Sequence, residues 1–148
     1  MDKIIDCDNV EKAKRMIKDS KEKPILLIAK NDAFNRKMIE YGKFDFIVDI
    51  ENGKRKDNLR QIDSGLNHYL AKEAAKNKIS LAIDMESVRG FNKRESGEVV
   101  EKIMQNIRLC RKAGTKIRLL NAKDKKDAFS WLISLGASTK QAKEAISF

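Results

Sequence analysis

Two neighbouring stretches near the middle of the chain carry side chains suited to binding anions. The loop 54–56 reads Lys-Arg-Lys, and the run 63–68 reads Asp-Ser-Gly-Leu-Asn-His and holds the only histidine. Asp63 or Ser64 can accept hydrogen bonds from the first free N–H groups of a helix, and Gly65 leaves the backbone uncovered there. A phosphate could approach these donors closely, so the two stretches predict a site for a phosphate-rich partner.

The helix predicted to follow has two different faces. Leu66, Leu70 and Ala74 recur at helical spacing and predict a buried face. His68 and Lys72 lie four residues apart on another face, which is basic. The alternative is a capped, solvated surface helix without a ligand, and the spacing alone favours that alternative.

The distribution of charge favours the binding interpretation. The 148 residues hold 32 Lys and Arg against 22 Asp and Glu, a net charge of +10. The first 50 residues hold 11 basic and 10 acidic side chains, so nine of the ten excess charges lie beyond Ile50. A lopsided basic charge is expected of a protein that binds nucleic acid.

Residues for catalysis are few. One histidine cannot build a histidine-rich metal centre, and no Gly-rich phosphate loop is present. Cys7 and Cys110 are far apart in the sequence and each lies in an apolar stretch, so buried thiols are expected rather than nucleophiles.

Four aspartates follow predicted strands, where barrel enzymes place catalytic groups. Asp6, Asp8, Asp49 and Asp84 could form an all-oxygen Mg²⁺ site. The simpler interpretation is that acidic residues after strands cap the next helix, and we prefer it.

Length and composition set further limits. The chain is expected to form one domain over residues 1–148, with 41% apolar residues for its core. No apolar run approaches the ~18 residues that span a bilayer, so no membrane contact is expected. The N-terminus lacks the layout of a signal peptide, and two cysteines fit a reduced compartment, so a cytoplasmic location is expected.

Strands and helices alternate along the chain. Strands are predicted at 4–7, 25–29, 44–50, 79–83 and 116–120. Helices are predicted after Asp8 or Asn9, from Asn31 or Asp32 to Gly42, from about Ser64, along a stripe from Val99 to Cys110 that stops at Gly114, from Ala128 to Leu135, and from a capping box of Ser138 and Gln141. This alternation predicts an α/β fold with a parallel sheet of about five strands. An open sheet or an incomplete TIM-barrel-like fold is possible, whereas a complete barrel needs ~200 residues or more.

Two central segments and the C-terminal helix pair resemble one known protein family. Arg55-Lys56-Asp57 and the run from Asp63 to Ile79 are similar to the basic loop and the "D-S-G-L-N-x-x-L-A-K-x-A" helix of archaeal and eukaryotic ribonuclease P protein component 3, the thirty-kilodalton subunit. The run Asn106-Ile107-Arg108-Leu109-Cys110-Arg111-Lys112-Ala113-Gly114 resembles the family's "N-x-R-L-C-R-K-x-G" helix end. Leu135-Gly136 and the run 142–145 resemble its C-terminal helix pair.

The resemblance implies a TIM-barrel-like fold and a supporting role in removing the 5′ leader from precursor tRNA. In that enzyme the RNA carries the active site, so the protein itself would bind no cofactor, while the RNA-containing holoenzyme uses Mg²⁺. The implied partners are ribonuclease P RNA, precursor tRNA and a small protein subunit of ferredoxin-like fold. Neither a catalytic residue nor a metal ligand of the protein is expected.

Two features depart from the family. Its members usually carry additional βα units, so this chain resembles a short member whose barrel does not close. Where the family often has a Ser-Gly or Ser-Ala strand end, the run 119–122 reads Leu-Leu-Asn-Ala. Contacts made by that loop are expected to differ.

The residues expected to bind RNA or a partner combine the basic loop, the helix start and the end of the long helix. They are Lys54, Arg55, Lys56, Arg60, Ser64, Gly65, Asn67, His68, Lys72, Arg89, Arg108, Arg111 and Lys112. Two other functions stay open: a free-standing RNA-binding domain that uses the same surface, and a small Mg²⁺-dependent α/β hydrolase that uses the aspartates.

Overall fold

A computed structural model describes residues 3–52, 63–90 and 93–147, and it contains one five-stranded parallel sheet. The strands are β1 (Lys3–Ile5), β2 (Ile25–Ile28), β3 (Phe46–Val48), β4 (Ser80–Asp84) and β5 (Ile117–Leu120). Their order in the sheet is β1-β2-β3-β4-β5, the same as their order in the chain. The five predicted strands are confirmed, although β3 is shorter than expected because a 3-10 turn, η1 (Ile50–Asn52), follows it.

The helices are α1 (Val10–Asp19), α2 (Asp32–Tyr41), α3 (His68–Lys76), α4 (Met85–Arg89), α5 (Lys93–Ala113), α6 (Lys125–Ser134) and α7 (Thr139–Ile146). Asn9 and Asn31 cap α1 and α2, as two of the predicted starts require. The predicted capping box at Ser138 and Gln141 is confirmed, because both of its hydrogen bonds form. The short helix α4 was not predicted. It begins because the Asp84 carboxylate accepts a hydrogen bond from the backbone N–H of Glu86 at 3.0 Å.

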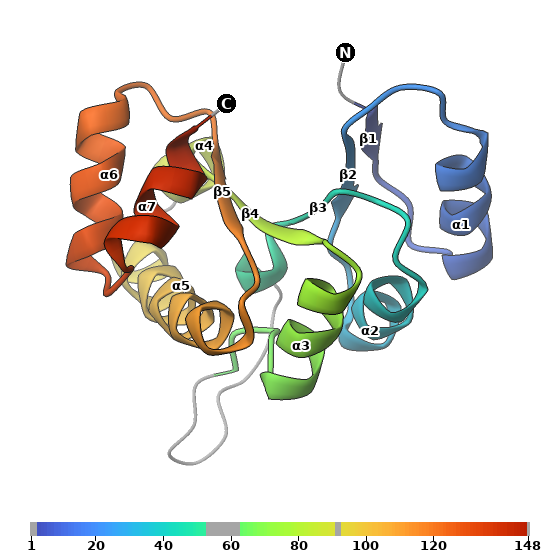
Figure 1. The fold of residues 1–148 in the computed structure, drawn as a ribbon, viewed down its shortest axis with the longest axis horizontal. Coiled ribbons are helices and arrows are strands. Elements are labelled where there is room, and N and C mark those ends of the chain that lie inside the picture. Colours follow the sequence, from blue (N-terminus) through green and yellow to red (C-terminus); the bar gives the residue numbers. More distant parts are fainter. Residues whose placement is uncertain (1–2, 53–62, 91–92, 148) are drawn as a thin grey trace.

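One face of the sheet carries the main core. Side chains alternate between the faces of a strand, and Ile5, Leu27, Ile47, Leu81 and Leu119 are each 0–1% exposed beneath the helices. Figure 1 shows the helices gathered on the outer side of the curved sheet. The stripe predicted for the long helix is confirmed, because its apolar members Val99, Ile103, Ile107 and Cys110 are buried in this core.

Figure 1 shows no helix over the opposite face of the sheet in the described parts of the chain, and this face is apolar. Leu26, Val48 and Ala82 form a second, smaller cluster on it, with Phe46 packed beside them. Ile4, which pairs with Leu26 in the parallel register, is 61% exposed. These residues, Ala82 apart, line a hollow of about 680 Å³. In a closed (β/α) barrel the corresponding layer would be filled by branched side chains from all the strands. The fold is therefore an incomplete TIM-barrel-like α/β fold.

No helix in the described parts of the chain is both long and apolar enough to cross a membrane.

Candidate nucleic-acid interface

The start of α3 differs from the sequence prediction. The helix begins at His68, and its N-cap is Asn67, whose side-chain oxygen accepts a hydrogen bond from the Leu70 N–H at 2.8 Å. Gly65 has a φ of +84°, so the backbone at this position is left-handed and the chain is still in a turn before the helix begins. The expected cap at Asp63 or Ser64 is wrong, and Gly65 does not lie against the first donors of the helix.

Asp63 and Ser64 belong to the turn before the helix. The Asp63 carboxylate accepts a hydrogen bond from the Gly65 N–H at 3.1 Å. The Ser64 hydroxyl donates to the Leu66 carbonyl at 3.4 Å and is 1% exposed, so it cannot reach a ligand directly. Ser64 therefore shapes the turn that presents Asn67 and His68.

Asn106 of α5 and Thr115, two residues beyond the end of α5, hold α3 and the turn before it in place. Asn106 is 1% exposed, and its side-chain N–H donates to the Ser64 carbonyl at 3.3 Å. Thr115, just beyond the end of α5, donates its hydroxyl to the Ala71 carbonyl at 2.6 Å. The two segments that carry the family resemblance are thus joined by a buried hydrogen bond.

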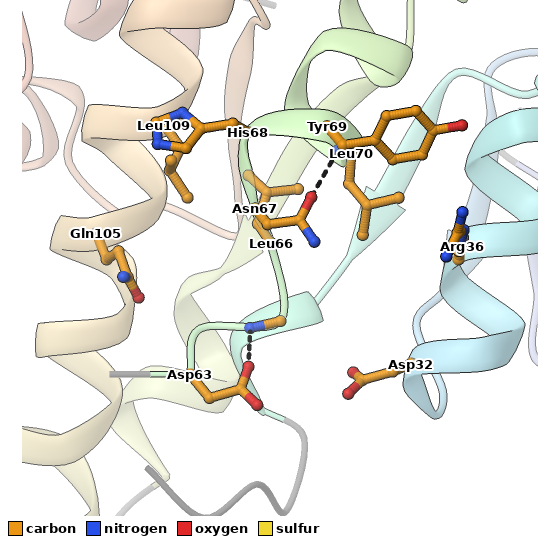
Figure 2. A pocket seen from close by; sticks show the side chains of 11 residues that line it. Asp32, Arg36, Asp63, Leu66, Asn67, His68, Tyr69, Leu70, Gln105 and Leu109 are labelled. Carbon is orange, nitrogen blue, oxygen red and sulfur yellow. Dashed lines mark hydrogen bonds between the residues drawn. The ribbon is translucent and has the colours of Figure 1, made fainter. Parts of the chain in front are cut away.

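Two adjoining hollows lie along this junction, and we call them together the α3–α5 groove. The first, of about 730 Å³, lies over the start of α3 between α2 and α5; Figure 2 shows Asp32 and Arg36 on α2 and Gln105 and Leu109 on α5. The second, of about 640 Å³, shares His68, Gln105 and Leu109 with the first. It extends along α5 to Arg108, Arg111 and Lys112.

The two hollows differ in charge. Arg108, Arg111 and Lys112 are exposed at the second hollow, as expected for the outward face of the helix end. The first hollow mixes the carboxyl groups of Asp32 and Asp63 with the guanidinium of Arg36. Phosphates are therefore expected at the second hollow, and uncharged polar groups in the first.

The remaining predicted residues lie elsewhere. Lys72 is exposed on α3 but does not line the groove. Arg89 ends α4 and donates to the Asn121 carbonyl at 3.0 Å, beyond the ends of β4 and β5. Asn121 thus takes part in a local contact at the strand end where the sequence departs from the family. The residues Lys54, Arg55, Lys56 and Arg60 fall outside the described parts of the chain, as does any patch that they form.

Sequence reasoning missed Arg36, Tyr69 and Gln105, although all three line the groove. No spacing in the sequence places α2 beside the start of α3, so Arg36 could not be assigned to this site. The buried contact of Asn106 could have been predicted from the sequence. It is an amide on the stripe of Ile103, Ile107 and Cys110, and a polar residue at such a position needs a buried partner.

The strand-end aspartates are only partly explained as helix caps. Asp84 caps α4, whereas Asp6 pairs with Lys30 and Asp8 is exposed. Asp49 has a φ of +63°, and its carboxylate accepts from the Asp84 N–H at 3.4 Å and from the Ser87 hydroxyl at 3.3 Å. Among the described residues, no three His, Cys, Asp or Glu side chains are placed to share a metal ion.

The two cysteines differ in burial. Burial of Cys110 raises the pKa of its thiol to about 12, and the hydrogen bond with Thr115 offsets only part of this effect. Cys110 is therefore a core residue, as predicted, and Cys7 is partly exposed.

Substituting Asp49→Asn is expected to raise the melting temperature at pH 7. Burial, and then repulsion from Asp84, raise the pKa of Asp49, so the folded state holds its proton more tightly than the unfolded chain. The destabilising effect of the ionised carboxylate therefore grows as the pH rises above the pKa of the unfolded chain and levels off above the raised pKa of the folded state. Asn removes the charge and tolerates the left-handed backbone.

Thermal melts at pH 7 and pH 4.5 check this prediction, with the exposed Asp8→Asn as the control. The gain should shrink at pH 4.5, and the control should change little at either pH. A lower melting temperature for Asp49→Asn at pH 7 would contradict the prediction.

Comparison with solved structures gives a likeness that bears on the fold. The chain is similar to a chain in a cryo-EM structure of archaeal ribonuclease P with mature tRNA, with a TM-score of 0.79 and 18% sequence identity. The alignment covers 98% of this chain and 63% of the other, so this chain spans less than two thirds of its neighbour's length. At this identity the likeness establishes a shared fold. No protein-family model matches the sequence, and no curated protein matches it.

Proposed function

We propose that this chain is a non-catalytic protein subunit of ribonuclease P, of the component 3 type, which binds and stabilises the catalytic RNA. The α3–α5 groove carries this proposal, because the two segments that resemble the family meet there and place three exposed cations along one hollow. The shared fold with a chain of archaeal ribonuclease P supports it further.

The cations act by neutralising phosphates. Arg108, Arg111 and Lys112 are exposed near the end of α5, so they can contact a nucleic-acid backbone without moving the core. Arg111 and Lys112 also lie in the last turn of the helix, where positive charge stabilises the helix dipole by roughly 0.3–1 kcal/mol each. RNA contact and this structural role are compatible, and measurements of binding and of melting separate them.

The same proposal covers the wider assembly. The chain acts as one domain over residues 1–148, in the cytoplasm, with ribonuclease P RNA, precursor tRNA and a small ferredoxin-like subunit as partners. The cleavage chemistry and its Mg²⁺ belong to the RNA. The loop 54–60 is part of the RNA-binding surface in this proposal, together with Lys72 and Arg89.

Reconstitution tests the proposal. The purified chain is added, with its partner subunits, to ribonuclease P RNA, and cleavage of precursor tRNA is measured at limiting Mg²⁺. Cleavage should increase several-fold with the chain, and the chain alone should cleave nothing. Each reaction is matched by one that lacks only this chain.

Two outcomes would replace the proposal with another function. Tight RNA binding without any effect on precursor-tRNA cleavage would favour a free-standing RNA-binding domain. A Mg²⁺-dependent cleavage by the protein alone that Asp49→Asn abolishes would favour a hydrolase.

A further inference from the structure

An exposed tyrosine lies in the first hollow of the α3–α5 groove. Tyr69 is the second residue of α3 and is 46% exposed. The Arg36 guanidinium lies over its ring at 5.3 Å from the centroid. Figure 2 shows Tyr69 beside Arg36, with Gln105 and Leu109 on α5 across the groove.

Arg36 and Tyr69 are in contact in the chain alone, so the pair does not need a ligand to form. Arg36 also pairs with Glu40 one turn along α2, with its Nε 2.9 Å from the Glu40 carboxylate. The ring therefore has a cation against it, and Tyr69 as a residue is still 46% exposed. A flat, electron-rich ring of this kind is a stacking surface for a nucleobase.

Gln105 offers an independent signal for a ligand. Its side chain lines both hollows, and its amide oxygen is buried with no hydrogen-bond partner among the described residues. A buried acceptor without a donor costs free energy, which a ligand N–H or hydroxyl group would recover. Base edges and ribose 2′-hydroxyls carry such donors.

The distribution of charge orients this ligand. Arg108, Arg111 and Lys112 at the second hollow attract phosphates, whereas the lining of the first hollow mixes carboxyl groups with the guanidinium of Arg36. His68 lines both hollows and joins the two regions. The first hollow, of about 730 Å³, falls within the range of about 300–1,000 Å³ that is typical of small-molecule sites.

We propose that the α3–α5 groove binds an unpaired segment of RNA, with one base stacked on Tyr69 and the adjoining phosphates against Arg108, Arg111 and Lys112. This inference rests on the proposed function for the identity of the nucleic acid. A base inside a duplex has both faces covered by its neighbours, so stacking on Tyr69 requires a base that is free of a helix. The groove thus distinguishes unpaired from paired RNA.

Binding of the full chain to two labelled RNAs tests the inference. One RNA is a short single strand without self-complementarity, and the other is a closed hairpin that is almost wholly duplex. Fluorescence anisotropy at several salt concentrations gives the affinities. Tyr69→Leu should weaken single-strand binding roughly 5- to 150-fold and leave hairpin binding unchanged.

The only other tyrosine in the chain provides a matched control. Tyr41 also has cations over its ring, Lys14 at 5.2 Å and Lys43 at 5.4 Å, but it does not line the groove. Tyr41→Leu should leave both affinities unchanged. Tyr69→Phe keeps the ring and should bind the single strand within about twofold of the native chain.

Chemical protection gives a second readout that does not depend on a substitution. The single strand should slow nitration of Tyr69 by tetranitromethane and leave nitration of Tyr41 unchanged, as measured on peptides by mass spectrometry. If the small protein subunit protects Tyr69 while RNA does not, the groove is a protein interface and the inference is wrong.

Equal single-strand affinities for Tyr69→Leu and Tyr41→Leu would also overturn the inference. If that result accompanies normal stimulation of ribonuclease P RNA, the subunit assignment stands and only the stacking site fails. If Tyr69→Leu weakens binding but the native chain never stimulates cleavage, the stacking site stands and the subunit assignment fails.

Discussion

Asn106→Ala is expected to lower the free energy of unfolding by about 1–3 kcal/mol, the cost of leaving a buried polar group without its partner. Asn106 is 1% exposed, and the Ser64 carbonyl that accepts its N–H belongs to a residue that is equally buried. For a chain of this size, each kcal/mol corresponds to a melting-temperature change of about 2–4 °C.

Gln105→Ala is the matched control, because Gln105 is the neighbouring residue of the same helix and its side chain is only partly buried. Its melting temperature should not fall below that of the native chain, since Ala favours the helix and the substitution removes a buried amide oxygen that has no hydrogen-bond partner among the described residues. Asn106→Asp should lower the melting temperature more than Asn106→Ala does, because a carboxylate cannot donate to the Ser64 carbonyl and its charge is buried. Equal melting of Asn106→Ala and the native chain would show that the link between α3 and α5 contributes little.

The second large effect is expected from removing the three cations of the groove together. The triple variant Arg108→Ala, Arg111→Ala, Lys112→Ala should bind RNA more weakly and with a shallower dependence on salt. Each lost contact with a phosphate of a single strand lowers the steepness of the slope of log affinity against log salt by about 0.7, because fewer counterions are released. The slope of log affinity against log salt should therefore fall by about two.

A triple variant on α1 controls for net charge. Lys12, Arg15 and Lys18 are exposed on a helix at the far edge of the sheet, so their replacement by Ala removes the same charge away from the groove. This variant should retain most of the native affinity and slope. If both variants lose affinity alike, RNA responds to overall charge rather than to the groove. If the α5 variant melts much lower and binds normally, its cations serve the helix dipole.

Local signals were enough to predict most of the fold. Asn31 and Gly42 bound α2 as expected, and the capping box at Ser138 forms because its two partners are three residues apart. Such features depend on residues that are close in sequence. The start of α3 was misplaced because Asp63, Ser64 and Asn67 are all good caps, and the positive φ of Gly65 decides among them.

The candidate site was predicted only in part, because it depends on packing between helices. The outward placement of Arg108, Arg111 and Lys112 follows from the period of α5 alone. Their position beside His68 depends on how α5 lies against α3. Arg36 comes from a third helix, α2, and only the order of the strands brings it to Tyr69.

The order of the strands also bears on how the chain is made. Each of β2 to β5 pairs with the strand that precedes it in the chain, so no strand waits for a later one to be inserted beside it. Pairing each strand with its neighbour in the chain keeps the sequence separation of these contacts as short as a parallel sheet with helical crossovers allows. During synthesis from the N-terminus, every strand from β2 to β5 therefore emerges after the strand with which it first pairs. The strands thus leave the ribosome in the order in which they lie in the sheet. The α3–α5 groove is complete only when α5 has emerged.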